Sequence, residues 1–213
     1  MMDAKGLAKQ ILPPGVLIHL RAARTLPIRH WPLYWRVRAL GALRLDRARV
    51  IRSILFVCQG NAIRSPLAAA LLRRCLSAPG SASIAIASAG LRASPGQPAD
   101  PRARSVAEGF GVSLEDHRAK LVTQERVTWA DVIVPMDALV AAELLGRYPG
   151  VRSKTVLLDN IADPYDHDVA EIRRCGDRIH AAVQEFASVL ARDTDAPPGG
   201  GSHARWRPTE TRR

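Results

Sequence analysis

The stretch from Ser53 to Pro66, S-I-L-F-V-C-Q-G-N-A-I-R-S-P, decides the fold of this 213-residue chain. Ser53–Val57 is a short, mostly apolar run, which predicts a buried strand. Gly60 and Asn61 follow it, and these two residue types tolerate a left-handed backbone in a tight loop. Ser65-Pro66 is typical of the first turn of a helix. The stretch therefore predicts a strand, a tight loop and the beginning of a helix.

The same alternation of strand and helix continues through residues 51–192. Further strands are predicted at Ser83–Ser88, Asp131–Val134 and Lys154–Leu157, and helices at Pro66–Leu76, Pro101–Gly109, Asp137–Gly146 and Asp168–Ala191. Strands separated by helices form parallel sheets with right-handed crossovers. We expect an α/β fold with a four-stranded parallel sheet flanked by helices. Ligands of such folds bind beyond the carboxyl ends of the strands, where Cys58 follows Val57.

The two ends of the chain differ from this middle part. Residues 1–50 hold ten Lys or Arg against two Asp, so +8 of the formal net charge of +11 belongs to them. Prolines divide this basic extension into two predicted helical pieces, around Val16–Arg24 and Leu33–Arg49. Residues 193–213 contain P-P-G-G-G-S and predict a flexible tail. We expect three parts: an extension (1–50), a globular domain (51–192) and a tail (193–213).

Composition excludes several classes of protein. No apolar run is long enough for a membrane-spanning helix, and no secretory signal is expected. The three cysteines, Cys58, Cys75 and Cys175, are widely spaced. They predict neither a disulfide framework nor a zinc site, and they fit a reducing cytoplasm. We expect no metal and no cofactor.

The loop after the first strand has the parts that phosphate chemistry needs. Five residues separate Cys58 from Arg64. A loop that ends in a helix N-terminus turns its backbone N–H groups inward and binds anions. Such a site can lower the pKa of a cysteine by several units from about 8.5, which makes Cys58 a candidate nucleophile. Arg64 offers a planar fork for two phosphate oxygens. Ser65 can donate a hydroxyl hydrogen to the thiolate or to a loop carbonyl.

The loop V-C-Q-G-N-A-I-R-S-P resembles the phosphate loop of the low-molecular-weight protein tyrosine phosphatases, V-C-x-G-N-x-C-R-S-P. Further motifs of that family also have counterparts here, in order: Ser88-Ala89-Gly90, Gly96-x-Pro98-x-Asp100, His117-Arg118-Ala119, Asp131 to Met136 and Asp163-Pro164-Tyr165. The resemblance covers about residues 51–192. It implies a phosphotyrosine phosphatase I-like fold and a phosphomonoester hydrolase with a phosphocysteine intermediate.

The resemblance also assigns roles to single residues. Asp163 is the candidate general acid, with Asp166 and Asp168 as nearby alternatives, because one carboxyl can protonate the leaving oxygen and later deprotonate a water. Tyr165 is expected to wall the site against a substrate ring. Asn61 is expected to hold the loop in shape, and His117 to be structural rather than catalytic. The remaining candidate substrate-binding residues belong to the loop itself: Gln59, Gly60, Ala62, Ile63 and Ser65.

Two positions depart from the family pattern. Ile63 stands where most relatives have a second cysteine, so oxidised Cys58 is expected to lack a neighbouring thiol that could trap it as a disulfide. Ala62 stands where the tyrosine-specific branch commonly has Ile and the arginine-phosphatase branch has Thr. Ala62 thus matches neither branch. The family resemblance implies phosphotyrosine as the substrate, with phosphoarginine or small phosphate esters as an alternative. A phosphate-binding adaptor with little turnover is a second alternative, and the presence of Asp163 argues against it.

The resemblance implies a phosphorylated protein as partner, with a tyrosine kinase of a polysaccharide-export system as a candidate. The basic extension leaves two possibilities. Its second piece interleaves Tyr34 and Trp35 with arginines and repeats apolar residues at helical spacing. Such a helix can bind an anionic membrane surface or an acidic partner, or it can pack on the globular domain. Specific nucleic-acid binding is not expected, because charge alone gives only non-specific attraction. The expected location is the cytoplasm, with peripheral attachment to the inner membrane face as an option.

Overall fold

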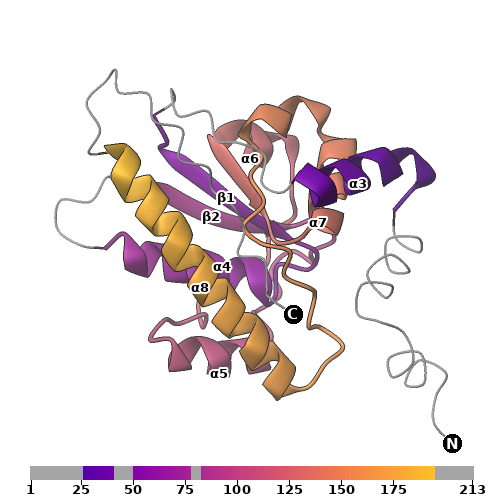
Figure 1. Cartoon of the computed structure of the whole chain (residues 1–213). Helices are drawn as coiled ribbons and strands as arrows, with labels where there is room; N and C mark the ends of the chain where they lie inside the picture. The colour runs from indigo at the N-terminus through magenta and orange to yellow at the C-terminus, as the bar shows by residue number, and fades with distance from the viewer. Residues whose placement is uncertain (1–25, 41–49, 78–82, 195–213) are drawn as a thin grey trace, which may run out of the picture.

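The computed structural model describes residues 26–40, 50–77 and 83–194 (Figure 1). Three predicted parts lie outside these residues: the helix at Val16–Arg24, residues 41–49 of the helix at Leu33–Arg49, and the tail after Thr194. The elements follow in this order: η1 Ile28–His30, α3 Trp31–Leu40, β1 Ser53–Cys58, α4 Arg64–Cys75, β2 Ala85–Gly90, α5 Pro101–Gly109, α6 Gln124–Trp129, β3 Val132–Pro135, α7 Ala138–Arg147, η2 Pro149–Lys154 and α8 Val169–Thr194.

Strand β1 lies at the centre of a parallel sheet with the order β2-β1-β3. Its side chains alternate between two cores, because successive residues of a strand point to opposite faces. Ile54 and Phe56 pack with α4, α5 and α8, whereas Leu55 and Val57 pack with α3, α6 and α7. Figure 1 shows these two helix layers on either side of the sheet. The prediction of a parallel sheet flanked by helices is confirmed.

The prediction of four strands is wrong, since the sheet has three strands among the residues that the structure describes. The segment expected as the fourth strand, Lys154–Leu157, does run beside β3, but it forms only an isolated bridge between Thr155 and Ile133. The N–H of Val156 donates to the carbonyl of Ile133 at 2.8 Å, and that of Leu158 reaches Pro135 only at 3.4 Å. Proline has no N–H with which to return a bond. The ladder therefore stops at Pro135.

Most of the predicted elements agree with the structure to within a few residues, and α5 has the predicted bounds. Helix α6 was not predicted. It is only six residues long, and its signals are local ones: the side chain of Thr123 caps it by accepting a hydrogen bond from the N–H of Arg126. Short helices with so few residues give little periodicity to detect.

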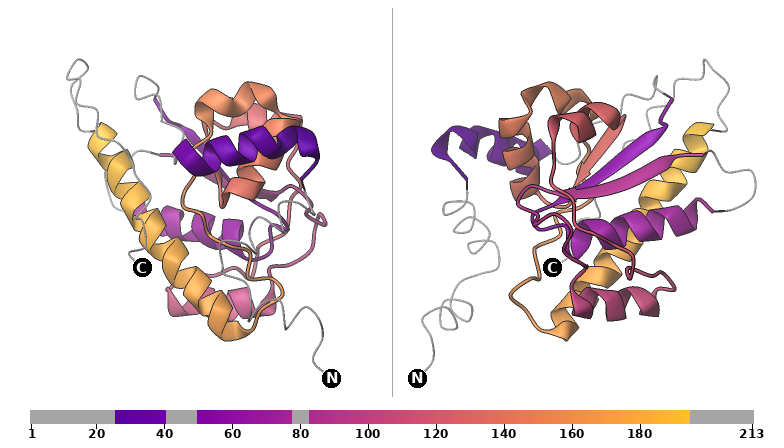
Figure 2. Two further views of the ribbon diagram at one scale, coloured as in Figure 1. Left: turned by 45° about the vertical axis from the view of Figure 1, so that its right-hand side comes forward. Right: turned by 180° about the vertical axis from the view of Figure 1, so that it is seen from behind.

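Helix α3 packs against α7, on the face of the sheet that α6 and α7 cover (Figure 2). Tyr34 is fully buried there, and Leu26 and Val37 share its core. The ring of His30 lies so close to Gly146 that a Cβ at that position would collide with it. Residues 26–40 therefore form an added layer on the domain. In the part of the chain that the structure describes, no helix is both long and apolar enough to pass through a membrane.

Candidate active site

The loop between β1 and α4 has the shape that its sequence predicts. Cys58 is the last residue of β1, and α4 begins at Arg64. Asn61 has a φ of 54°, the left-handed conformation expected for it. The N–H of Asn61 donates to the Cys58 sulfur at 3.1 Å, and the Ser65 hydroxyl lies 3.0 Å from the same atom. The Asn61 N–H is thus a donor to the sulfur, and in the pair of Cys58 and Ser65 either atom can be the donor.

Asn61 is fully buried, and its side chain joins the loop to three other segments. Its Nδ2 donates to the hydroxyls of Ser65 at 2.9 Å and Ser88 at 3.0 Å, and its Oδ1 accepts from the N–H of Lys120 at 2.8 Å. Its own carbonyl oxygen lies 2.7 Å from Nε2 of His117. Because Asn61 already donates to the Ser65 oxygen, the Ser65 hydroxyl hydrogen is left for the sulfur or for the Ala89 carbonyl at 3.3 Å.

Gly90, which the sequence analysis did not include in the site, lets β2 approach the loop. It pairs with Cys58 across the sheet, and a Cβ at this position would lie 2.7 Å from the Gln59 carbonyl oxygen and 2.8 Å from the Asn61 nitrogen. The two residues after it also hold the loop: Leu91 N–H donates to Cys58 O at 3.0 Å, and Arg92 N–H to Gln59 O at 2.8 Å. The Ser88-Ala89-Gly90 motif was the signal that could have identified this role.

Arg64 lies under the loop with a side chain that is almost completely buried. Its Nη1 donates to Asp137 Oδ2 at 2.5 Å and to the Ile161 carbonyl at 2.9 Å, and its Nη2 donates to Asp163 Oδ2 at 2.5 Å. Burial opposes the charge, but the carboxylates of Asp137 and Asp163, together with Cys58, raise the pKa of Arg64 above its ordinary value. Arg64 is therefore a fixed cation at the bottom of the site.

Asp137 was also missed as a site residue, although the sequence places it at the beginning of a predicted helix. It is buried, and its Oδ1 accepts from the N–H of Val140 at 2.7 Å, which caps α7. Its other oxygen holds Arg64. One residue therefore both caps the start of α7 and anchors the guanidinium.

Asp163 belongs to the loop of residues 159–168, which we call the acid loop. Its carboxylate is one-third exposed, and its Oδ1 accepts a hydrogen bond from the N–H of Tyr165 at 3.3 Å. Arg102, at the N-terminal end of α5, donates to the carbonyls of His167 at 2.6 Å and Tyr165 at 3.2 Å. The Asp100 carboxylate holds Arg102 in turn, at 2.7 Å. Arg102 is a contact of the acid loop that the sequence analysis did not identify.

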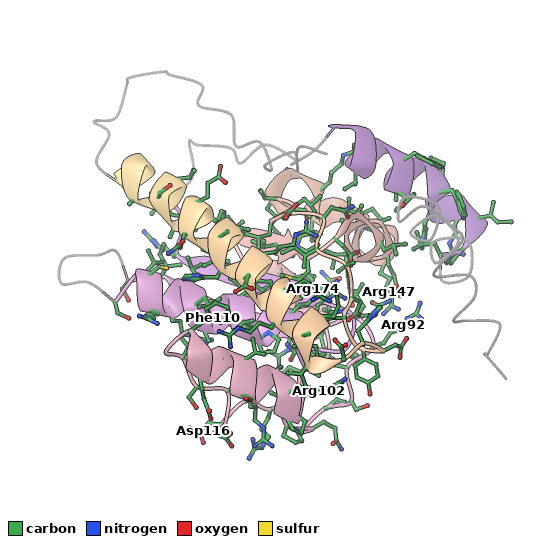
Figure 3. All side chains as sticks on the ribbon, turned by 60° about the horizontal axis from the view of Figure 1, so that its bottom comes forward. Arg92, Arg102, Phe110, Asp116, Arg147 and Arg174 are labelled. Carbon is green, nitrogen blue, oxygen red and sulfur yellow. The ribbon has the colours of Figure 1, made fainter. Side chains whose placement is uncertain are left out.

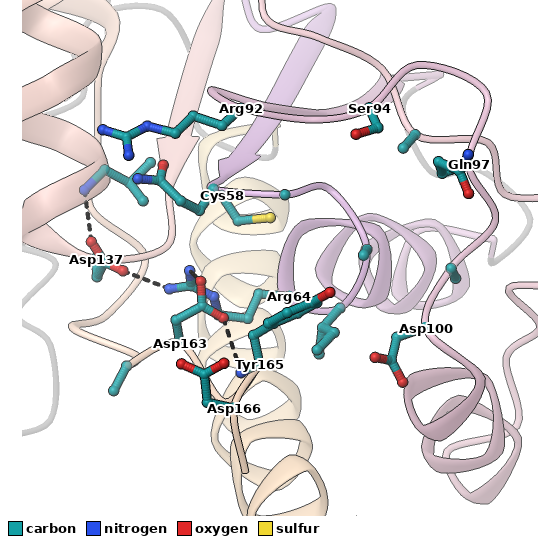
Figure 4. A pocket seen from close by; sticks show the side chains of 18 of the residues that line it. Cys58, Arg64, Arg92, Ser94, Gln97, Asp100, Asp137, Asp163, Tyr165 and Asp166 are labelled. Carbon is teal, nitrogen blue, oxygen red and sulfur yellow. Dashed lines mark hydrogen bonds and ion pairs between the residues drawn. The ribbon is translucent and has the colours of Figure 1, made fainter. Parts of the chain in front are cut away.

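Cys58, Arg64, Asp163 and Tyr165 line one pocket of about 810 Å³ (Figure 4). Of the predicted loop residues, Gln59, Gly60, Ala62 and Ile63 also line it, whereas Asn61 and Ser65 lie behind the loop and shape it. Asp166 reaches the pocket, and Asp168 does not line it; Asp168 instead accepts from the N–H of Glu171 at the start of α8. The structure thus brings the cysteine, the arginine and the first-choice acid into one cavity.

The two other cysteines lie outside this cavity. Cys75 is exposed at the end of α4, and Cys175 is buried in α8. Burial raises the pKa of Cys175 to about 12, because the thiolate is disfavoured in an apolar setting. Ile63 is buried and offers no thiol to Cys58.

Comparisons with known proteins agree with this geometry. Residues 53–196 match the family model described as "Low molecular weight phosphotyrosine protein phosphatase". A protein named as a probable low molecular weight protein-tyrosine-phosphatase, EpsP of Ralstonia nicotianae, is 37% identical over 147 residues, which cover 69% of this chain and 94% of that protein.

Two solved structures have the same fold. The tyrosine phosphatase AmsI of Erwinia amylovora is 34% identical, with a TM-score of 0.64 over 70% of this chain and 99% of its own. The YwlE arginine phosphatase of Geobacillus stearothermophilus is 29% identical, with a TM-score of 0.63 over 71% of this chain and 99% of its own.

Proposed function

The chain belongs to the low molecular weight phosphotyrosine protein phosphatase family and is a cysteine-based tyrosine phosphatase, and we propose that Cys58, Arg64 and Asp163 carry its reaction. The observation that supports this assignment best is the pair of contacts on the Cys58 sulfur, one from the Asn61 N–H and one with Ser65, in a cavity shared with Arg64 and Asp163. Each of these groups has a separate task in the two steps of the reaction.

In the first step the Cys58 thiolate attacks phosphorus. A sulfur–phosphorus bond forms, and the bond between phosphorus and the leaving oxygen breaks. The backbone N–H groups of the loop residues that line the pocket and the guanidinium of Arg64 bind the three remaining phosphate oxygens. Asp163 gives its proton to the leaving oxygen, so that the alcohol or phenol departs neutral.

In the second step the Asp163 carboxylate takes a proton from a water molecule, whose oxygen attacks the phosphocysteine. The sulfur–phosphorus bond breaks, inorganic phosphate is released and Cys58 returns to the thiolate. Asp163 must leave Nη2 of Arg64 for both steps, since it is bound there at 2.5 Å. A phosphate dianion can replace it because the dianion offers the same acceptor oxygens with more charge. Asp137 stays on Nη1 and keeps Arg64 in place.

We propose phosphotyrosine in a protein as the substrate. Tyr165 stands at the pocket wall with 61% of its surface exposed, where its ring can contact the ring of the substrate. Ala62 also lines the pocket, and its small side chain leaves room for that ring. Phosphoarginine is the alternative, and turnover of a phosphotyrosine peptide against the matching phosphoarginine peptide distinguishes the two.

The mechanism is tested by turnover of p-nitrophenyl phosphate. We expect Cys58→Ser to lose essentially all activity, because a serine hydroxyl is not ionised at neutral pH. We expect Asp163→Asn to lose about a hundredfold or more, within the range for removal of a general acid, while it still forms the phosphoenzyme with this good leaving group. Trapping of the phosphoenzyme by rapid acid quench measures the second point. Equal activity in the wild type and both variants would rule out the mechanism.

A further inference from the structure

The two sides of the pocket mouth carry opposite charges. Arg92 lies on one side, beyond Cys58, and the carboxylates of Asp100, Asp163 and Asp166 lie on the other (Figure 4). A protein substrate with its phosphate in the pocket must pass over one of these sides. Asp163 is paired with Arg64 and Asp100 with Arg102, whereas Arg92 and Arg147 share the single carboxylate of Glu143. Acidic residues next to the phosphotyrosine are therefore attracted more strongly to the side of Arg92.

The basic side continues along helix α7. Arg92 and Arg147 both contact the carboxylate of Glu143, and Figure 3 shows their side chains next to each other. Glu143 is the one acidic residue of α7, and it is buried, where it also accepts from Gln59 Nε2 at 3.1 Å. Arg92 and Arg147 keep about half and two-fifths of their side chains exposed. The solvent-facing charge of this side is therefore positive.

A second, smaller pocket lies at the far end of α7. Its volume is about 290 Å³, and its polar lining consists of Arg29, His30 and Arg152. No acidic residue is among the described residues that line it. Arg29 and His30 come from the N-terminal segment, outside the part of the chain that matches the family model. His30 is buried, and its Nδ1 has no hydrogen-bond partner among the described residues.

We propose that Arg92, Arg147, Arg29 and Arg152 form a docking surface for an acidic segment of the protein substrate. We call these four residues the α7 basic surface. The inference rests on the proposed function, because it takes the phosphotyrosine to be in the pocket of Cys58. The occupant is an extended stretch of the substrate chain that carries Asp, Glu or further phosphate groups, and it runs from the mouth of the active site to the second pocket.

The length of α7 sets the position of the acidic residues. Leu139 and Val140 line the active-site pocket, and Leu145 and Gly146 line the second one. Leu139 and Gly146 are seven residues apart on α7, which corresponds to about 10 Å at 1.5 Å per residue. An extended peptide advances about 3.3 Å per residue, so about three residues cover this distance. Acidic groups beyond the third position from the phosphotyrosine therefore meet Arg29 and Arg152, and those closer to it meet Arg92.

The test uses the full chain and three kinds of phosphotyrosine peptide. One has neutral flanks, one has three Glu at positions one to three from the phosphotyrosine, and one has three Glu at positions four to six. Each acidic peptide is made in two versions, with the Glu residues on the N-terminal or on the C-terminal side of the phosphotyrosine. We compare kcat/KM of the wild type with that of Arg29→Gln/Arg152→Gln. The control Arg104→Gln/Arg174→Gln removes two charges from α5 and α8, on the other face of the sheet.

We expect the wild type to prefer an acidic peptide to the neutral one. Arg29→Gln/Arg152→Gln should lower kcat/KM about three- to tenfold for the peptide with Glu at positions four to six, as expected for two exposed ion pairs. The same variant should leave kcat/KM for the neutral peptide unchanged. The preference should weaken in 0.5 M salt, a condition chosen to be well above physiological ionic strength. The control double variant should behave like the wild type. Equal losses in both double variants, or no preference for acidic peptides, would overturn the docking surface.

Two further outcomes distinguish a wrong docking surface from a wrong active site and from a membrane contact. If the wild type turned over neither p-nitrophenyl phosphate nor the neutral peptide, the proposed function itself would be wrong. Binding to vesicles of phosphatidylglycerol tests for a membrane contact. If Arg29→Gln/Arg152→Gln abolished binding to these vesicles but left the peptide preference intact, the surface would be a membrane contact and the proposal of a substrate-docking surface would be wrong.

Discussion

The phosphate loop of residues 58–65 and the acid loop of residues 159–168 meet at Arg64, yet they are held differently. The phosphate loop lies between β1 and α4, and Asn61, Arg64 and Ser65 in it are almost completely buried. Its shape is fixed by the Asn61 side chain and by the backbone of β2. In the acid loop Tyr165 is well exposed. Beyond one backbone bond, from the Ile161 N–H to the Met136 carbonyl, side chains of other elements hold this loop: Arg64, Arg102 and Arg178.

This difference corresponds to the tasks of the two loops. The phosphate loop has to present its N–H groups in one arrangement through both chemical steps, and the buried hydrogen bonds of Asn61 hold that arrangement without reorganisation. Asp163 has to move between Arg64, the leaving oxygen and a water molecule. Side-chain contacts at the surface allow such movement more readily than a backbone ladder does. We therefore expect the phosphate loop to tolerate far less change than the acid loop.

Among the variants that test this difference between the loops, the largest effect is expected for Gly90→Ala. The added Cβ would lie within 3 Å of backbone atoms of Gln59, Gly60 and Asn61, so the phosphate loop must shift. A displacement of about 1 Å in a catalytic group can lower activity about a hundredfold, and we expect a fall in kcat/KM of that size. Turnover of p-nitrophenyl phosphate measures it. Mass spectrometry of the Cys58 peptide after iodoacetate treatment should also show slower alkylation.

Gly150→Ala is the matched control, because no atom lies within 4 Å of a Cβ at that position. It should keep wild-type activity. Thermal unfolding of Gly90→Ala distinguishes a shifted loop from an unfolded protein. A folded Gly90→Ala variant with wild-type turnover and alkylation rates would show that the phosphate loop adjusts as readily as the acid loop, and the contrast between the two loops would be wrong.

A smaller effect is expected for Arg102→Met. The variant loses the bonds to the carbonyls of Tyr165 and His167, but Asp100 still caps α5 through the backbone N–H of residue 102. Asp163 then becomes less well placed as a general acid. We expect kcat/KM to fall about threefold to tenfold for phenyl phosphate, less than the full contribution of general acid catalysis. For p-nitrophenyl phosphate it should fall less, because that leaving group needs a proton less.

Arg104→Met provides the control for this split, since Arg104 lies on the same helix but pairs with Glu115 and not with the acid loop. Arg104→Met should leave the ratio of kcat/KM for phenyl phosphate to kcat/KM for p-nitrophenyl phosphate unchanged. Equal losses on both substrates with Arg102→Met would indicate a general loss of structure instead of a misplaced acid.

The two loops also differ in how far the sequence could predict them. The phosphate loop is a contiguous motif. One stretch of sequence therefore predicts the preceding strand, the left-handed Asn61 and the start of the following helix. The partners of the acid loop come from distant segments. Arg102 and Asp163 are far apart in the sequence, and Arg102 has no local feature that marks it as a contact. Asp137 was predicted to begin a helix, but its bond to Arg64 depends on the position of α7 relative to α4.

The predicted number of strands was wrong for a related reason. The residues of Lys154–Leu157 have a strand-like composition and do lie beside β3, but their pairing depends on which residue of β3 faces them. That residue is Pro135. The pairing register of the two segments cannot be predicted from the sequence of either segment alone. The same holds for α3, whose packing on α7 depends on the space above Gly146.

The smallest effect concerns His117, which joins the phosphate loop to the segment that follows α5. Burial lowers the pKa of His117, and the nearby cations Lys120, Arg73 and Arg118 act in the same direction, against the bond to Asn61 O. An unfolded histidine titrates near pH 6.5, so below that pH the unfolded chain binds the proton more readily than the folded one. The contribution of neutral His117 is complete above pH 6.5 and is lost as the pH falls toward the folded pKa.

We therefore expect the free energy of unfolding to decrease on acidification from pH 7.5 to 5.5, and to decrease less in His117→Gln. Urea unfolding curves at several pH values measure this difference, which removes the common contribution of the carboxylates. His180→Gln is the control, because His180 lies on α8, where its ring packs against Phe110. If His117→Gln kept the whole pH dependence of the wild type, His117 would not be coupled to the buried side of the loop. The rigidity of the phosphate loop would then depend on Asn61, Ser65 and Ser88 without the imidazole.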